Sequence, residues 1–137
     1  MMQTIDIEPM ASPRPRFSRH GTYMPSTYTK WKQEFLSLWQ MRSYKTYDAG
    51  IPLAVTIRFY VKPPDRIAKA KKNQESLQAE SIPVVVKPDT DNYIKSVLDA
   101  LNGEAWADDN QIVAIHAVKL YSLNPRIELE VAEWYTH

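Results

Sequence analysis

The sequence predicts an α+β fold, in which one small domain has a mixed β-sheet packed against two main helices. The chain has 137 residues, 44% of them hydrophobic, which suits a single domain with one core. Some segments repeat apolar residues at the three- and four-residue spacing of a helix, and shorter ones alternate apolar and polar residues as strands do. No internal repeat or low-complexity tract divides the chain, so we expect residues 1–137 to form one domain.

The N-terminal half predicts a strand, a loop, a helix and a second strand, in that order. Residues 2–9 have the pattern of a short strand that stops at a proline, and residues 10–26 have the proline and glycine content of a loop. Residues 27–43 predict a helix whose cap is Ser26 or Thr27. Its core-facing stripe consists of Trp31, Phe35, Leu38 and Trp39. Residues 51–61 alternate most regularly and predict the clearest strand.

The C-terminal half predicts a short strand, a helix and two further strands. Residues 62–80 are polar, begin with several basic residues and lack an apolar stripe, so they form either a mobile loop or a short surface helix. Residues 82–86 predict the short strand, which leads into a helix over 91–102. The apolar face of that helix consists of Ile94, Val97, Leu98 and Leu101, and Gly103 follows as a stop. Residues 111–121 and 126–134 predict two strands joined as a hairpin.

The composition limits the chemistry available to the protein. The chain has no cysteine, which excludes disulfides and thiolate metal sites, and its three histidines are far apart in the sequence. Any metal is therefore expected among oxygen ligands, which favours magnesium, manganese or calcium over zinc. The N-terminus lacks the pattern of a signal peptide and no segment is apolar enough to span a membrane. We expect a cytoplasmic protein without a membrane partner.

The net charge of +1 hides a difference between the two halves. Residues 1–72 contain 13 Lys or Arg and 5 Asp or Glu, whereas residues 73–137 contain 4 and 11. A basic half suits a polyanionic partner such as nucleic acid. The alternative is that the two halves interleave in the fold and neutralise each other.

Residues 87–112 gather six carboxylates around one helix. Asp89 and Asp91 lie at its start, and Asp108 and Asp109 follow its end. Ordinary helix electrostatics explain single residues: Asp89 as a cap, Asp91 against the helix dipole, and Lys95 in i, i+4 ion pairs. Alternatively the loop after the helix doubles back and the two acidic pairs meet. Carboxylates at such close range require a divalent cation between them, and that arrangement fits metal-assisted phosphodiester hydrolysis.

The segment "KPDTDNYIKSVLDALNG", followed by "WADDNQI", resembles the signature of the RusA family of Holliday junction resolvases. Members are homodimeric endodeoxyribonucleases that are often found in phages and prophages. The N-terminal "RPRF" and "TYMPSTYTKW" are also similar to the start of the family, and the resemblance is weakest over residues 62–80.

The resemblance implies roles for individual residues. Asp89, Asp91 and one of the pair Asp108 and Asp109 would bind Mg²⁺, for which Mn²⁺ is a substitute; we favour Asp109 and keep Asp108 as a neighbouring candidate. Lys95 falls on the essential lysine of the family. We expect Asp99 to be a structural hydrogen-bonding or ion-pairing group, Trp106 to pack beneath the acidic pair, and His116 to lie in the core or at an interface. The expectations for Asp99, Trp106 and His116 depend on the local sequence pattern as well as on the resemblance.

The basic half supplies the predicted DNA-binding residues. Arg14, Arg16 and Arg19 are expected to bind phosphates. Lys69, Lys71 and Lys72 extend this track or form an ordinary solvated surface. The sequence therefore predicts a magnesium-dependent, structure-selective endodeoxyribonuclease that resolves four-way junctions by paired symmetric nicks in recombination and repair. A metal-dependent nuclease for other branched DNA, or a DNA-binding module without activity, are the alternatives.

Overall fold

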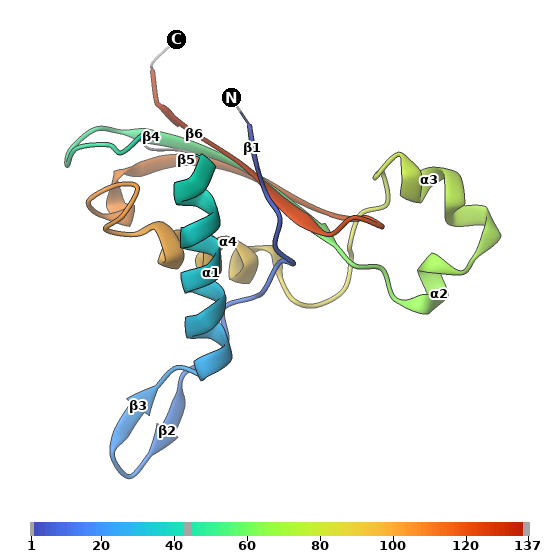
Figure 1. Ribbon diagram of the computed structural model, residues 1–137, viewed down its shortest axis with the longest axis horizontal. Helices are drawn as coiled ribbons and strands as arrows, with labels where there is room; N and C mark the ends of the chain where they lie inside the picture. Colours follow the sequence, from blue (N-terminus) through green and yellow to red (C-terminus); the bar gives the residue numbers. More distant parts are fainter. Residues whose placement is uncertain (1, 43–44, 136–137) are drawn as a thin grey trace.

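Strand β4 (Leu53–Val61) is the centre of the fold. In the computed structural model, which describes residues 2–42 and 45–135, it pairs parallel with β5 (Ile112–Tyr121) and antiparallel with β6 (Arg126–Glu133). Strand β1 (Gln3–Ile5) extends the sheet beyond β6, giving the order β1-β6-β4-β5. Helices α1 (Ser26–Arg42) and α4 (Thr90–Leu101) both cover one face of this sheet (Figure 1). The predicted α+β class is confirmed.

The hairpin predicted for the last two strands is wrong, because β4 lies between them. Four side chains of β4, Leu53, Val55, Ile57 and Phe59, are at most 1% exposed. A strand this apolar is most stable with a neighbour on each side. Parallel pairing of β4 with β5 needs a crossover connection, and α4 is part of that connection.

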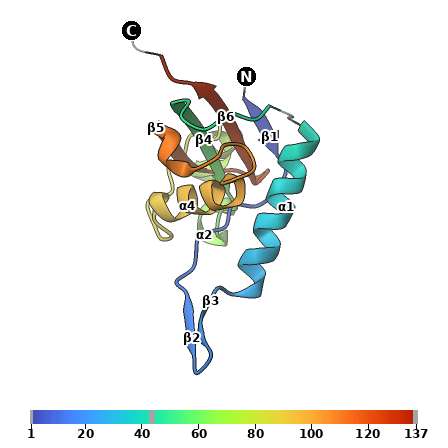
Figure 2. The same ribbon diagram turned by 90° about the vertical axis from the view of Figure 1, so that its left-hand side faces the viewer.

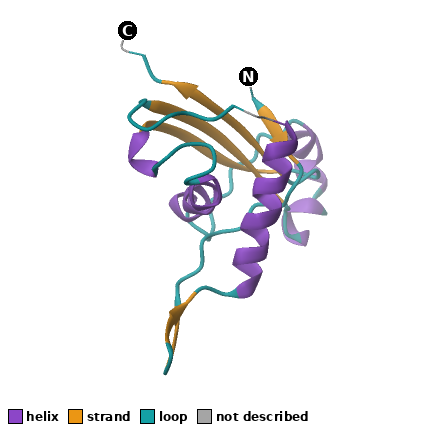
Figure 3. Cartoon of the chain, turned by 60° about the vertical axis from the view of Figure 1, so that its left-hand side comes forward, coloured by secondary structure: helices purple, strands orange, loops and turns teal. Residues whose placement is uncertain are grey.

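The two helices form the core with the sheet. On α1, the buried residues are Tyr28, Trp31, Phe35 and Trp39, which confirms most of the predicted stripe. On α4, Tyr93 stacks on Phe59 of β4 with ring centroids 5.2 Å apart. Burial of each such side chain contributes roughly 1.5–3 kcal/mol, so this face holds the helices in place. Figure 3 shows both helices beneath the same sheet face.

Residues 62–80 form an arm that projects from one end of the sheet (Figure 1). It contains α2 (Asp65–Ala68), a 3₁₀ turn η1 (Lys71–Asn73) and α3 (Gln74–Gln78), so the short-helix alternative is confirmed. Leu77 packs against Val84 and Tyr121 in a small second core. At the end of the arm, the Arg126 guanidinium donates to both carboxylate oxygens of Glu80, at 2.6 and 2.8 Å. These hydrogen bonds lower the pKa of Glu80 and tie the arm to β6.

The N-terminal loop contains a hairpin that the sequence did not predict. Strands β2 (Arg16–Ser18) and β3 (Gly21–Tyr23) pair antiparallel and project away from the sheet (Figure 2). Gly21 has a φ of +113°, which suits the tight turn. The strand predicted over residues 82–86 does not form; only an isolated bridge joins Pro83 to Leu120. Pro83 has no N–H to donate, which opposes a continuous ladder there.

The longest described helix, α1, has 17 residues, and none of the helices in the described ranges is both long and apolar enough to cross a bilayer.

Candidate active site

The first acidic pair lies at the N-terminus of α4. Asp89 is the N-cap residue, with φ −68° and ψ 150°, but its side chain makes no capping hydrogen bond. Asp91 is in the first turn and Lys95 lies one turn further along; all three side chains are exposed. Within the described ranges, Lys95 makes no ion pair. A capping hydrogen bond therefore does not account for Asp89, nor i, i+4 pairing for Lys95, whereas Asp91 still suits the positive end of the helix dipole.

The backbone that carries Asp89 is held by Lys119 of β5. Its ammonium group donates to the carbonyl oxygens of Val86 and Pro88, at 2.8 and 2.7 Å. Lys119 pairs in register with Phe59, so it occupies an inward position of the strand. The sequence reasoning missed this residue. A lysine at an inward position of a strand was the available signal, because an ammonium group that is partly removed from water needs hydrogen-bond partners.

The second acidic pair lies in the turn between α4 and β5. Asp108 caps the 3₁₀ turn η2 (Asp109–Gln111), and its side chain accepts from the backbone N–H of Asn110 at 3.2 Å. The buried side chain of Gln111 accepts from the N–H of Asp108 at 3.0 Å. It also donates to the carbonyl of Asp48 at 2.8 Å. This turn is therefore fixed to the segment that precedes β4.

Asp109 is the half-buried member of the pair. Its Oδ1 accepts from the indole N–H of Trp106 at 2.7 Å, and Trp106, only 2% exposed, packs beneath it as expected. Burial raises the pKa of Asp109, the Trp106 hydrogen bond opposes this, and the charges of Asp99 and Asp108 raise it further. The carboxylate of Asp99 accepts from the Tyr28 hydroxyl at 2.7 Å, in agreement with its predicted structural role.

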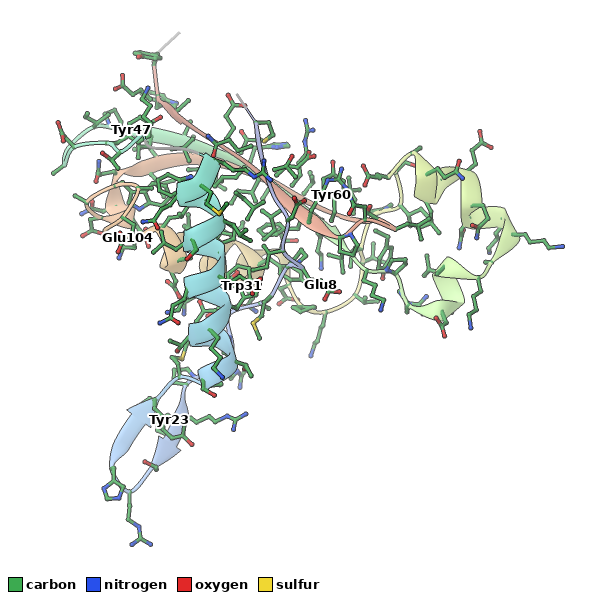
Figure 4. The ribbon with its side chains drawn as sticks, viewed as in Figure 1. Glu8, Tyr23, Trp31, Tyr47, Tyr60 and Glu104 are labelled. Carbon is green, nitrogen blue, oxygen red and sulfur yellow. The ribbon has the colours of Figure 1, made fainter. Side chains whose placement is uncertain are left out.

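The two acidic pairs lie at opposite ends of α4. Twelve helical residues span about 18 Å. Asp89 is beside Lys119 near the end of β5, whereas Asp109 precedes the start of that strand, which is roughly 25 Å away at 3.3 Å per residue. In Figure 1 the segments before and after α4 leave it on opposite sides, and in Figure 4 Glu104 marks the later one.

One chain alone does not bring the predicted ligands together. Among residues 2–42 and 45–135, no group of three His, Asp or Glu side chains is placed to hold a metal ion. The loop after α4 does not double back because Ala105 and Trp106 are buried where the helix ends. The N–H of Tyr47 also donates to the carbonyl of Ala105 at 2.9 Å.

The predicted DNA-binding residues lie on two projections. Arg14, Arg16 and Arg19 are exposed on or beside the β2–β3 hairpin, where Figure 4 labels Tyr23. The lysines are exposed on the arm: Lys69 pairs with Asp65 at 3.4 Å, and Lys71 and Lys72 lie on η1. An exposed pair of this kind contributes little to stability, so Lys69 stays available for other partners.

These features define a class of protein: an α+β domain with exposed carboxylates at a helix start and basic projections beside them. Residues 6–132 match the family Endodeoxyribonuclease RusA, and the chain belongs to this family. Membership implies endodeoxyribonuclease activity.

Among curated proteins, the chain is similar to "Uncharacterized protein YqaN" of Bacillus subtilis (strain 168). The two are 34% identical over 134 residues, which cover 95% of this chain and 94% of the relative. The similarity therefore extends over nearly the whole length of both chains.

We expect Asp109→Asn to raise the thermal unfolding midpoint of the metal-free protein at pH 7. The folded state raises the pKa of this carboxyl, so ionisation destabilises the fold at pH values above the folded pKa. The amide oxygen of Asn still accepts from Trp106. Thermal unfolding in EDTA from pH 4 to 8 should show the gain shrinking as the pH falls toward the ordinary carboxyl pKa. Asp108→Asn is the control, because Asn caps as well as Asp; an Asp109→Asn midpoint at or below wild type would contradict the interpretation.

Proposed function

We propose that this protein is a magnesium-dependent endodeoxyribonuclease that resolves four-way DNA junctions by paired symmetric nicks, in recombination and repair in the cytoplasm. The proposal depends chiefly on Asp89 and Asp91, whose exposed carboxylates stand beside Lys95 in a chain of the RusA family. Carboxylates repel phosphate, so a protein that only bound DNA would gain nothing from them at this position. The same carboxylates are favourable when they bind a cation that in turn contacts the phosphate.

The donor set fits magnesium. All candidate ligands are carboxylate oxygens, which Mg²⁺ and Mn²⁺ accept, and the chain has no cysteine for a softer metal. When bound, the ion supplies an activated water and neutralises charge on the phosphate. Asp89, Asp91 and Asp109 would hold it, with Asp108 adjacent. Lys95 would bind the scissile phosphate and stabilise the negative charge that develops on it.

A homodimer would bring together the two acidic pairs, which lie apart in one chain. Strand β5 is an edge of the sheet, and two of its apolar side chains, Val113 and Ile115, are 55% and 42% exposed. Antiparallel pairing of β5 with β5 of a second copy places the start of one strand beside the end of the other. Asp109 of one copy then approaches Asp89 and Asp91 of its partner. The two sites are related by a two-fold axis, as paired symmetric nicks require.

The two basic projections would hold the DNA arms. The hairpin arginines present planar, forked donors to phosphates, and the arm lysines add point charges. Such contacts position the branched DNA without reading its sequence.

Cleavage of a synthetic mobile four-way junction tests the proposal. Wild type should cut it in Mg²⁺ by symmetric paired nicks, and EDTA should stop the reaction. Preferential cutting of flaps or forks would favour the nuclease for other branched DNA, and a band shift without cleavage would favour the inactive binding module.

In the same assay, Asp91→Asn should lower the cleavage rate by more than about a hundredfold, since losing even an outer partner of a metal site costs roughly 10–100-fold. Junction binding should stay equal or tighten, because a charge that repels phosphate is removed. Asp6→Asn is the matched control, since Asp6 is exposed at the opposite edge of the sheet. Loss of binding together with activity would make Asp91 a structural residue.

Arg16→Ala should weaken junction binding and make it less sensitive to salt. Each lost phosphate contact lowers the slope of log affinity against log salt by about one. Band shifts at several salt concentrations measure this slope. Arg42→Ala, at the far end of α1 from the hairpin, should leave it unchanged. An unaltered slope for Arg16→Ala would remove this residue from the DNA contacts.

Mixed dimers test whether two chains share each site. Asp91→Asn and Asp109→Asn should each be inactive alone, but a refolded equimolar mixture should recover about a quarter of the wild-type nicking rate. Half of the dimers are then mixed, and each has one intact site of two. Each junction bound by a mixed dimer should receive a single nick, in one of the two strands that the wild type cuts. An inactive mixture, with dimers confirmed by light scattering, would contradict a shared site.

A further inference from the structure

A pocket of about 430 Å³ lies directly beside the segment that carries Asp89. Its walls come from residues 61–65, where β4 passes into the arm, and from residues 84–88, which lead into α4. Lys87 and Pro88 line it, and they immediately precede Asp89. The pocket therefore adjoins the position proposed for the scissile phosphate.

Two buried tyrosines, Tyr93 and Tyr121, line this pocket. Each is only 4% exposed, yet neither hydroxyl has a hydrogen-bond partner within the described ranges. Among the described residues, Ser12 Oγ is the one side-chain polar atom that is both fully buried and without a hydrogen-bond partner. The two tyrosine hydroxyls are therefore not fully buried, and they remain accessible from the pocket that their residues line. Accessible hydroxyls that have no partner in the protein are free to form hydrogen bonds to a ligand in the pocket.

Both tyrosines line the same pocket. Burial is the main cause that raises the pKa of Tyr93, and the electrostatic influence of Tyr121 is the next. A ligand in this pocket can therefore contact both residues, and the hydroxyl group of each can donate and accept a hydrogen bond.

The remaining lining selects the kind of ligand. Pro63, Val84 and Val86 give apolar surfaces, on which a planar ring can pack. The charged residues of the lining, Lys62, Asp65 and Lys87, are all exposed, so the interior suits a neutral group. The two lysines at the mouth attract an anionic backbone. A nucleobase attached to a phosphodiester chain has all three properties.

We propose that this pocket binds the base of a nucleotide next to the cut phosphate, and that Tyr93 and Tyr121 form hydrogen bonds to its polar edge. The inference rests on the proposed function, because it takes the phosphate to lie at Asp89 and Asp91. A base leaves the stack at the lowest cost where its pairing is already disrupted, and the branch point is where such a base is expected. The pocket thereby gives the nuclease a sequence preference at the site of cleavage.

The first test compares cleavage of four-way junctions whose bases around the branch point are randomised, with the cut positions read by sequencing. Wild type should prefer one base at a position next to the cut. Tyr93→Phe and Tyr121→Phe, which each remove only a hydroxyl, should reduce that preference roughly two- to tenfold. Val86→Trp should block the pocket and abolish the preference. Val85→Trp is the matched control, since Val85 is 85% exposed and does not line the pocket.

The second test needs no cleavage. NMR spectra of metal-free wild type are recorded with single-stranded trideoxynucleotides of each base. The signals of Tyr93 and Tyr121 should shift in a base-dependent way, and Val86→Trp but not Val85→Trp should remove the shifts.

The two readouts separate the two proposals. Base-dependent shifts at these tyrosines without junction cleavage would support the pocket and overturn the proposed function. Junction cleavage with no base preference and no shifts at these tyrosines would overturn the pocket alone. A preference that survives in both Phe variants and in Val86→Trp would also overturn it.

Discussion

Helix α4 packs Tyr93, Val97 and Leu101 into the core beneath β4, and this packing sets the geometry of the site. The Tyr93 ring lies on Phe59, and the loop after the helix is buried at Ala105 and Trp106. Both ends of α4 are therefore fixed, and so is the distance between the acidic residues before and after it. A well-packed core resists the shift that would bring them together in one chain. The separation of the two acidic pairs is thus a property of the core and leads directly to the proposal of a shared site.

The two acidic pairs differ in how far their carboxylates are exposed to solvent. Asp89 and Asp91 are in solvent, where an unpaired carboxylate costs little. Asp109 is half-buried, and the Trp106 hydrogen bond only partly offsets the burial that raises its pKa. Perturbed carboxyls in such positions are common at functional sites. A cation shared between the pairs would relieve this cost, so metal binding and subunit association are expected to reinforce each other.

The residues around Asp89 and the two basic projections would have different roles in the proposed function. Lys119 holds the backbone below the carboxylates, and the pocket with Tyr93 and Tyr121 opens beside them. The hairpin and the arm project further out and carry the basic residues. In the proposed function, phosphate contacts on these projections would orient branched DNA, whereas the pocket next to the site would offer hydrogen bonds to a base. Affinity and sequence preference would then come from different parts of the chain.

The sequence alone determined the two main helices, the central strand, the lack of cysteine and the motif of Asp89, Asp91 and Lys95. Each depends on residues close together in the chain, where periodicity and spacing report local structure directly. Only the tertiary structure decided that β4 separates β5 from β6, that Lys119 holds the backbone before Asp89, and that Tyr93 and Tyr121 line one pocket. It also decided that the acidic pairs stay apart. Strand order and contacts between residues far apart in the sequence depend on how all the apolar surfaces pack into one core. Local periodicity carries no information about that packing.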